Sequence, residues 1–126
     1  MYIDSHCHLN HPMNGETVSP DQLIIQAKEA GTAGLQTICC RMHQEYELLT
    51  DIAEAHDNVW CSVGTHPHDA SNEKEKTYSV EDIVTLSKHP KVIGIGESGL
   101  DYYYDYADPQ DQKESFRKHI QTCQET

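Results

Sequence analysis

The chain has 126 residues, enough for one domain with a hydrophobic core but too few to close an eight-stranded α/β barrel, which takes roughly 250 residues. Nine Lys and Arg stand against 21 Asp and Glu, so the formal net charge is −12 with neutral histidines, and a broad basic surface for nucleic acids is excluded. A nucleic-acid enzyme whose metal ions supply the positive charge is not excluded, and nine histidines point to metal or acid–base chemistry.

The first half of the chain predicts two strand-then-helix units. Short apolar and β-branched runs predict strands over residues 2–8 and 35–40, and a polar segment over residues 10–18 predicts a loop. The first helix is expected to start at Ser19 and Pro20, an N-cap followed by a first-turn proline. Both units have the order that a parallel sheet with crossover helices requires.

The second half of the chain repeats this order. Strands are predicted over residues 59–65 and 92–97, and the polar residues 69–77 predict a loop. Ser79 predicts the start of a third helix, and Asp108, followed by proline, predicts the start of a fourth. The apolar residues that share one face of this last helix are expected to be buried: Phe116, Ile120 and Cys123.

The spacing of the strands predicts the fold class. The predicted strands begin near residues 2, 35, 59 and 92, hence 24 to 33 residues apart, which is typical of right-handed βαβ units. We therefore predict an α/β fold with about four βα units around a parallel sheet, as a single domain over residues 1–126. Because the last helix carries no stop signal and a four-stranded parallel sheet has unpaired edges, we expect the natural protein to continue beyond the last helix.

The cysteines and the apolar runs predict the compartment. Five cysteines cannot all pair within the chain, and the adjacent Cys39 and Cys40 have poor geometry for an ordinary disulfide. The first residues show no signal-peptide pattern, and no apolar run approaches the roughly 18 residues of a membrane span. We expect a reducing, cytoplasmic compartment and no membrane partner.

Two histidines at the end of the first predicted strand are the first candidate metal ligands. His6 and His8 are two residues apart in a strand and therefore point to the same face, whereas Cys7 points to the opposite, helix-covered face. Two imidazoles at this spacing can share one metal ion, and the alternative is a pair of polar residues at a strand end. In parallel α/β folds this end of the strands is where active sites form.

Glu97 ends the fourth predicted strand. Alternation along the strand is expected to place it on one face with Ile93 and Ile95. A carboxylate there can bridge metal ions beside the two histidines, and the alternative is an exposed acidic loop residue. Because both signals fall at the same end of the sheet, they support each other.

Other residues near the same end are candidates for substrate binding. His66 and His68 follow the third strand and can position a phosphate, or form a rigid polar loop. Asp101 and Tyr102 open an aromatic loop that can stack bases or sugars, or plug the rim of a barrel. Arg41 is one of few cations expected there and can contact a phosphate. The histidines in or beside predicted helices are expected to be solvated: His43, His56, His89 and His119.

Four segments together resemble the TatD-type metal-dependent hydrolases. They are residues 3–9 (IDSHCHL), 64–68 (GTHPH), 95–102 (IGESGLDY) and 112–120 (QKESFRKHI). They occur in order along the whole chain and are specific as a set. The resemblance implies an α/β fold of TIM-barrel type, a (β/α)8 barrel related to the amidohydrolases, of which this chain with its four βα units would be a truncated N-terminal half. In most members it also implies a deoxyribonuclease that cuts phosphodiester bonds with two divalent metals.

The resemblance also implies roles for residues. His6 and His8 would hold one metal, Glu97 would bridge both as the catalytic carboxylate, and the loop of His66 and His68 would line the substrate site. Family members are about twice as long. Their remaining ligands, two histidines and an aspartate that also serves as the base, come from the second half. The chain thus offers three ligands where two ions of Zn, Mg or Mn need more.

These residues predict a metal-dependent nuclease of the TatD type that binds DNA weakly, because a charge of −12 gives no long-range attraction. Three alternatives stay open. The chain can be a non-catalytic half-barrel that associates with itself through exposed barrel edges. Two copies can complete one barrel. The parent enzyme can also be amidohydrolase-like and cleave an amide or another ester.

Overall fold

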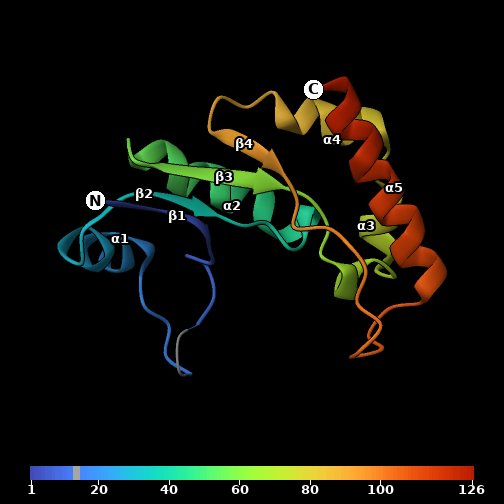
Figure 1. Ribbon diagram of the computed structural model, residues 1–126, viewed down its shortest axis with the longest axis horizontal. Helices are drawn as coiled ribbons and strands as arrows, with labels where there is room; N and C mark the ends of the chain where they lie inside the picture. The colour runs from blue at the N-terminus through green and yellow to red at the C-terminus, as the bar shows by residue number, and fades with distance from the viewer. Residues whose placement is uncertain (13–14) are drawn as a thin grey trace.

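The computed structural model describes residues 1–12 and 15–126 and shows one parallel sheet with helices between successive strands (Figure 1). The sheet has four strands in the order β1-β2-β3-β4, and each neighbouring pair is parallel. The predicted α/β fold with four βα units is confirmed. In chain order the elements are β1 (Tyr2–Cys7), α1 (Pro20–Glu29), β2 (Thr32–Thr37), α2 (Met42–Ala55), β3 (Val59–Val63), η1 (Pro67–Asp69), α3 (Glu73–Thr77), α4 (Val80–Ser87), β4 (Val92–Ile95) and α5 (Pro109–Glu125).

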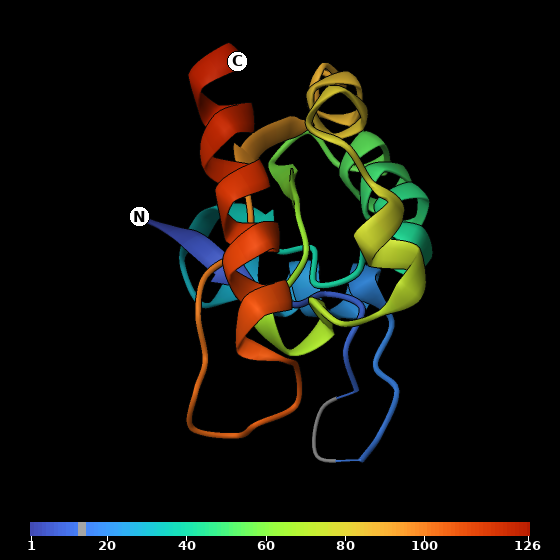
Figure 2. The same cartoon turned by 90° about the vertical axis from the view of Figure 1, so that its right-hand side faces the viewer.

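The hydrophobic core lies between the sheet and the helices that cover one of its faces. The alternate β3 residues Val59, Cys61 and Val63 are fully buried, and Leu49 of α2 and Ile83 of α4 belong to the same cluster. Figure 2 shows α2 and α4 along one side of β3. Burial of each large aliphatic side chain contributes roughly 1.5–3 kcal/mol, so this layer fixes the position of β3 and of the loop that follows it.

Side-chain caps define the helix starts that the sequence predicts. Ser19 accepts a backbone N–H of α1 ahead of its first-turn proline. Ser79 and Asp82 form a capping box on α4. Asp108 accepts two backbone N–H groups of α5. Among the described residues, no helix combines the length and apolar composition needed to cross a bilayer.

The second strand begins three residues earlier than predicted and ends at Thr37 rather than at residue 40. The residues after it stay buried: the Ile38 N–H still donates to Cys7 O of β1 at 2.8 Å, whereas the next two N–H groups donate to side chains. The backbone N–H of Cys39 donates to Ser62 Oγ at 3.0 Å, and that of Cys40 donates to Glu45 Oε2 at 2.6 Å. Because side chains replace the neighbouring strand as acceptors, an apolar run alone cannot locate this boundary.

Residues 69–77, predicted to be a loop, contain the end of η1 and all of α3. Asn72 caps α3 by accepting two of its backbone N–H groups, and α3 buries Glu75. The prediction was wrong because a single polar helical turn has no apolar stripe to reveal it. In the loop predicted over residues 10–18, residues 13 and 14 lie outside the described residues.

The last helix buries a different face from the predicted one. Ile120 is 44% exposed and Cys123 is also exposed. On its inward face, Gln112 forms hydrogen bonds with the backbone of the loop before α5. Its side-chain carbonyl accepts the Asp101 N–H at 2.7 Å, and its amide donates to the carbonyls of Asp101 and Ala107. Polar side chains can therefore be buried here without unpaired groups. The buried residues of α5 are Gln112, His119 and Thr122.

Candidate metal centre

The ends of β1, β3 and β4 bring three histidines and one glutamate together. His6 Nε2 lies 3.3 Å and His8 Nε2 lies 3.9 Å from Glu97 Oε2. One ligand atom from each of these residues lies within 4.8 Å of those of the other two. Cys7, between the histidines, packs instead against the core, and its thiol donates to a β2 carbonyl. The strand alternation predicted for β1 is therefore observed.

Glu97 reaches the histidines by a turn of the backbone rather than by strand alternation. β4 ends at Ile95, which packs against the core, and Gly96 has φ 153°, a region that favours glycine. The Gly96 N–H donates to Val63 O at 2.8 Å, and the Glu97 N–H donates to Cys39 O at 3.0 Å. The predicted shared face of Ile95 and Glu97 is wrong because the strand ends before Glu97.

Two glycines set the approach of the third and fourth strand ends. A Cβ atom added at Gly64 would lie 2.6 Å from the carbonyl carbon of Gly96, where ordinary contact begins near 3.4 Å. The backbones of these two glycines are thus in direct contact. This contact places the loop after β3 beside Glu97.

His66 contacts the other oxygen of the same carboxylate. Its Nε2 lies 3.5 Å from Glu97 Oε1, and its Nδ1 accepts the backbone N–H of His68 at 3.1 Å. A neutral His66 therefore carries its proton on Nε2 and faces the carboxylate as a donor. This orientation suits the predicted substrate-side role better than a role as a metal ligand.

Burial shapes the protonation of these histidines. Burial lowers the pKa of His8, and the neighbouring His11 and His6 lower it further. Burial also lowers the pKa of His66, despite the opposing effect of Glu97. Both imidazoles are therefore held toward the neutral form, which is the form that binds metals.

His68 and Asp101 are paired one step away from the carboxylate. His68 Nε2 lies 2.7 Å from Asp101 Oδ2. The hydrogen bond from His68 lowers the pKa of Asp101, with further help from the N–H groups of Tyr103 and Tyr104. Tyr102 is 55% exposed, and its role in substrate binding stays a prediction.

The candidate metal ligands line an open cavity with a volume of about 340 Å³. Arg41 lies on its wall together with His6, His66 and Glu97. Its Nη2 lies 3.5 Å from Glu45 Oε1. The structure thus places all but Tyr102 of the predicted site residues in this cavity or in direct contact with its lining.

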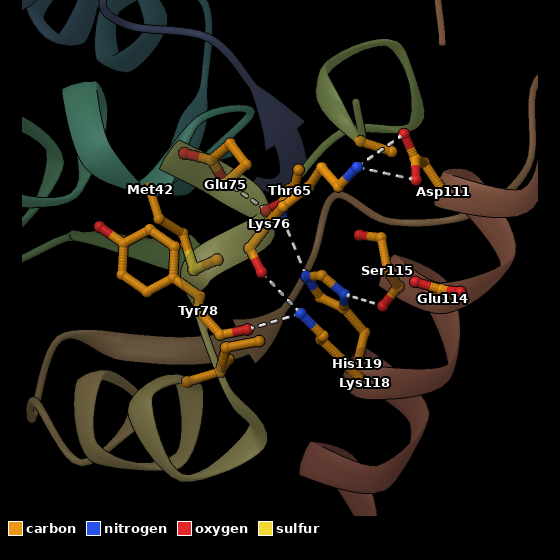
Figure 3. Close-up of a pocket in the computed structure, with 12 residues that line it drawn as sticks. Met42, Thr65, Glu75, Lys76, Tyr78, Asp111, Glu114, Ser115, Lys118 and His119 are labelled. Carbon is orange, nitrogen blue, oxygen red and sulfur yellow. Dashed lines mark hydrogen bonds and ion pairs between the residues drawn. The ribbon is translucent and has the colours of Figure 1, made fainter. Parts of the chain in front are cut away.

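A buried network behind the site was missed (Figure 3). His119, expected to be solvated, is 2% exposed, and its Nε2 accepts the Thr65 N–H at 3.0 Å. The Thr65 hydroxyl donates to Glu75, which also accepts the side chain and the backbone N–H of His43. Thr65 directly precedes His66, so α2, α3 and α5 all hold the loop that carries the site. Hydrophobic patterning gives no signal for these residues because the buried residues of α3 and α5 are polar.

Comparison with known proteins gives a consistent result. Residues 3–126 match a family model described as TatD related DNase. The 3′-5′ ssDNA/RNA exonuclease TatD of Salmonella typhimurium is 30% identical over 83% of this chain and 39% of its own. The protein named uncharacterized metal-dependent hydrolase YcfH, from Escherichia coli K12, is 34% identical over 98% of this chain and 45% of its own.

A solved structure shares the fold. The crystal structure of YJJV, a TatD homologue from Escherichia coli K12, aligns with a TM-score of 0.76 at 22% identity. It covers 98% of this chain and 47% of the other. The chain spans less than half the length of these curated relatives. With a family match over nearly its whole length, the chain belongs to the TatD related DNase family.

Proposed function

We propose that this chain carries the first half of the metal site of a hydrolase that cleaves phosphodiester bonds in DNA. The observation that carries the proposal is the approach of His6, His8 and Glu97, whose ligand atoms lie within 4.8 Å of one another. The names of the Salmonella and Escherichia coli relatives, an exonuclease and a metal-dependent hydrolase, support it.

The donor set fits a divalent cation. Two imidazoles and one carboxylate suit Zn²⁺ or Mn²⁺, and Mg²⁺ can bind if water completes its shell. Cys7, which would add a soft ligand, faces the core. We assign one cation to His6, His8 and Glu97. We further propose that Glu97 would also be a ligand of a second cation, as the resemblance to the family implies.

The residues of this chain have separate tasks in the proposed reaction. A divalent cation held by His6, His8 and Glu97 would supply Lewis-acid activation of a water and charge neutralisation at a phosphate. His66 donates from Nε2 toward a phosphate oxygen. Asp101 orients His68 through their 2.7 Å contact. Arg41 offers a cation on the cavity wall.

The charge of the chain bears on the substrate. With a net charge of −12, long-range attraction to DNA is absent, and binding depends on local contacts at the cavity. We propose weak binding and a preference for strand ends or single strands. Cytoplasmic localisation stays a prediction.

Metal content tests the site directly. The protein is purified without chelator, and bound metal is measured by elemental analysis for the unaltered chain and for His6→Ala. His89→Ala is the matched control, because His89 pairs with Glu54 on the surface. After loading with Mn²⁺, we expect near-stoichiometric Mn²⁺ in the unaltered chain and the control, and loss in His6→Ala. Absence of metal from the unaltered chain, or equal metal in all three, contradicts the assigned site.

Hydrolysis tests the chemistry. An end-labelled single-stranded oligodeoxynucleotide and a small aryl amide are incubated with the metal-loaded chain and with Glu97→Gln. Cleavage of the oligonucleotide that is lost in Glu97→Gln supports the proposal. Cleavage of the amide alone favours the amidohydrolase-like alternative. Metal binding without cleavage of either substrate identifies a non-catalytic half whose activity needs further residues.

A further inference from the structure

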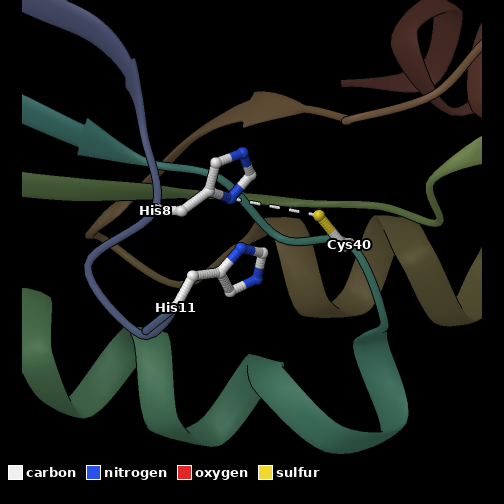
Figure 4. A group of neighbouring side chains, drawn as sticks. All are labelled: His8, His11 and Cys40. Atoms are coloured by element: carbon white, nitrogen blue, oxygen red, sulfur yellow. Dashed lines mark hydrogen bonds between the residues drawn. The ribbon is translucent and has the colours of Figure 1, made fainter. Parts of the chain in front are cut away.

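A second group of metal-ligand side chains lies on the other side of His8 (Figure 4). One ligand atom each of His8, His11 and Cys40 lies within 4.8 Å of the other two. His8 Nδ1 and Cys40 Sγ are 4.0 Å apart. These residues come from the end of β1, the loop after it and the segment after β2. The group uses Nδ1 of His8, whereas Nε2 of the same ring faces Glu97.

The thiol is held in a fixed position. Cys40 is 8% exposed, and its backbone N–H donates to Glu45 Oε2 at 2.6 Å. Glu45 itself is 4% exposed and also accepts the Arg41 N–H. A buried carboxylate thus anchors the backbone on both sides of the Cys40 carbonyl, which holds the backbone of Cys40 beside His8.

The group has unused ligand capacity and a favourable charge. His11 Nε2 is buried and has no hydrogen-bond partner among the described residues. It lies 3.6 Å from Glu45 Oε1. Glu45 Oε2 accepts the N–H groups of Cys40 and Arg41, which holds its carboxylate beside His11. A carboxylate at this position stabilises a bound cation.

We propose that His8, His11 and Cys40 form a second metal site, selective for a thiophilic divalent cation such as Zn²⁺ or Cd²⁺. One thiolate and two imidazoles are three of the four ligands of a tetrahedral zinc site, and all three residues line the cavity of the first site. Thiolate ligands discriminate against Mg²⁺ and Mn²⁺. The thiol proton leaves to solvent when the sulfur–metal bond forms, so no oxidant or reductant is involved.

One side chain must move for the site to close. The rings of His8 and His11 are stacked, with centroids 4.4 Å apart and planes within 4°. A ring nitrogen binds metal in the plane of its ring, so two parallel rings cannot share one ion. The His11 side chain is 39% exposed, and a turn about its Cβ–Cγ bond is a soft motion.

The shared histidine couples the two sites. A neutral imidazole has one nitrogen lone pair free for a metal, so His8 serves either the group with Glu97 or the group with Cys40. A thiophilic ion bound by Cys40 therefore removes His8 from the first site. This consequence rests on the proposed function, whereas the existence of the second site does not.

Cobalt is a suitable probe because a thiolate bound to Co²⁺ absorbs in the near ultraviolet. The chain is titrated with Co²⁺ as the unaltered protein and as Cys40→Ser. Cys123→Ser is the control, since Cys123 is the exposed thiol on α5. We expect the thiolate band in the unaltered chain and in the control, and its loss in Cys40→Ser. A band that survives Cys40→Ser, or disappears in Cys123→Ser, overturns the proposal.

Two further variants keep the test decisive. His11→Ala alters a half-exposed side chain, so it stays informative if Cys40→Ser fails to fold, and we expect its Co²⁺ affinity to fall at least tenfold. An unchanged affinity overturns the proposal.

His6→Ala should keep the thiolate band, and loss of the band would mean that the thiol belongs to one site with His6. Binding of Mn²⁺, followed by electron paramagnetic resonance, reports the first site and should be lost in His6→Ala but retained in Cys40→Ser. The failure of one site is thereby distinguished from that of the other.

Discussion

Replacing His119 by leucine should destabilise the loop that carries His66, and the size of the effect can be estimated from the structure. Thr65 is 3% exposed, and its N–H has His119 Nε2 as its hydrogen-bond acceptor at 3.0 Å. Leucine removes that acceptor but fills a similar volume. A buried N–H without a partner costs about 1–3 kcal/mol, and we expect a loss of about 2 kcal/mol in the free energy of unfolding.

Glutamine is the matched control for this substitution. Its side-chain carbonyl oxygen can accept the Thr65 N–H from the same position on α5, so His119→Gln should recover most of the stability. Urea unfolding followed by the fluorescence of Trp60, the one tryptophan of the chain, measures both variants. For a chain of this size, about 2 kcal/mol also corresponds to a fall of roughly 8 °C in Tm.

The comparison isolates the hydrogen bond from packing. If His119→Leu and His119→Gln unfold at the same urea concentration as each other, the acceptor on Nε2 does not hold the loop, and the reasoning is refuted. If both variants lose far more than about 3 kcal/mol, packing of the imidazole in the cavity beside α3 dominates instead.

Four further outcomes follow from the structure. Burial lowers the pKa of His119, so below pH about 6.5 the unfolded chain binds a proton at this residue before the folded chain does. The free energy of unfolding should therefore decrease as the pH is lowered, by up to about 1.4 kcal/mol per pH unit. In a pH series of urea titrations, His119→Gln should show a weaker pH dependence. Gly64→Ala forces a Cβ against Gly96 and should cost about 1–3 kcal/mol and weaken Mn²⁺ binding; unchanged affinity would contradict the role of this contact. The chain should self-associate through its exposed strand edges, and Ile93→Lys should shift sedimentation toward monomer; a monomer at every concentration for the unaltered chain would count against this. Tyr104→Ala should weaken binding of a single-stranded oligonucleotide by about fivefold to a hundredfold without affecting an abasic one, as expected for base stacking; equal losses for both would exclude stacking.

Sequence patterns located the strands and the candidate metal ligands at the end of β1 because both obey simple periodicity. His6 and His8 lie on the same side, as the two-residue repeat of a strand predicts, although the pairing of β1 with β2 is irregular between Asp4 and Cys7. Glu97 was identified correctly as a neighbour of these histidines, although the reasoning for it failed. Its position depends on a backbone turn at Gly96 and on the contact with Gly64, and neither feature has a periodicity.

The supporting network could not be predicted for a different reason. His119 and Glu75 lie in helices whose buried faces are polar, so hydrophobic patterning gives no sign that they are buried. Each is buried because a specific partner exists in another element: the Thr65 N–H for His119, and the hydroxyl of Thr65 and the imidazole of His43 for Glu75. Such pairs become visible only when the elements have been assembled.

The protonation of the site explains how an acidic chain can still attract a phosphate. An imidazole binds a metal in its neutral form, so the three residues assigned to the first cation would contribute only the single negative charge of Glu97. A divalent cation bound there would leave a local charge of about +1. Asp69, on the same cavity wall, has its pKa raised by burial, which weakens its opposing charge as pH falls. Affinity for a phosphodiester should therefore depend on metal occupancy rather than on the net charge of −12, and chelation should abolish it.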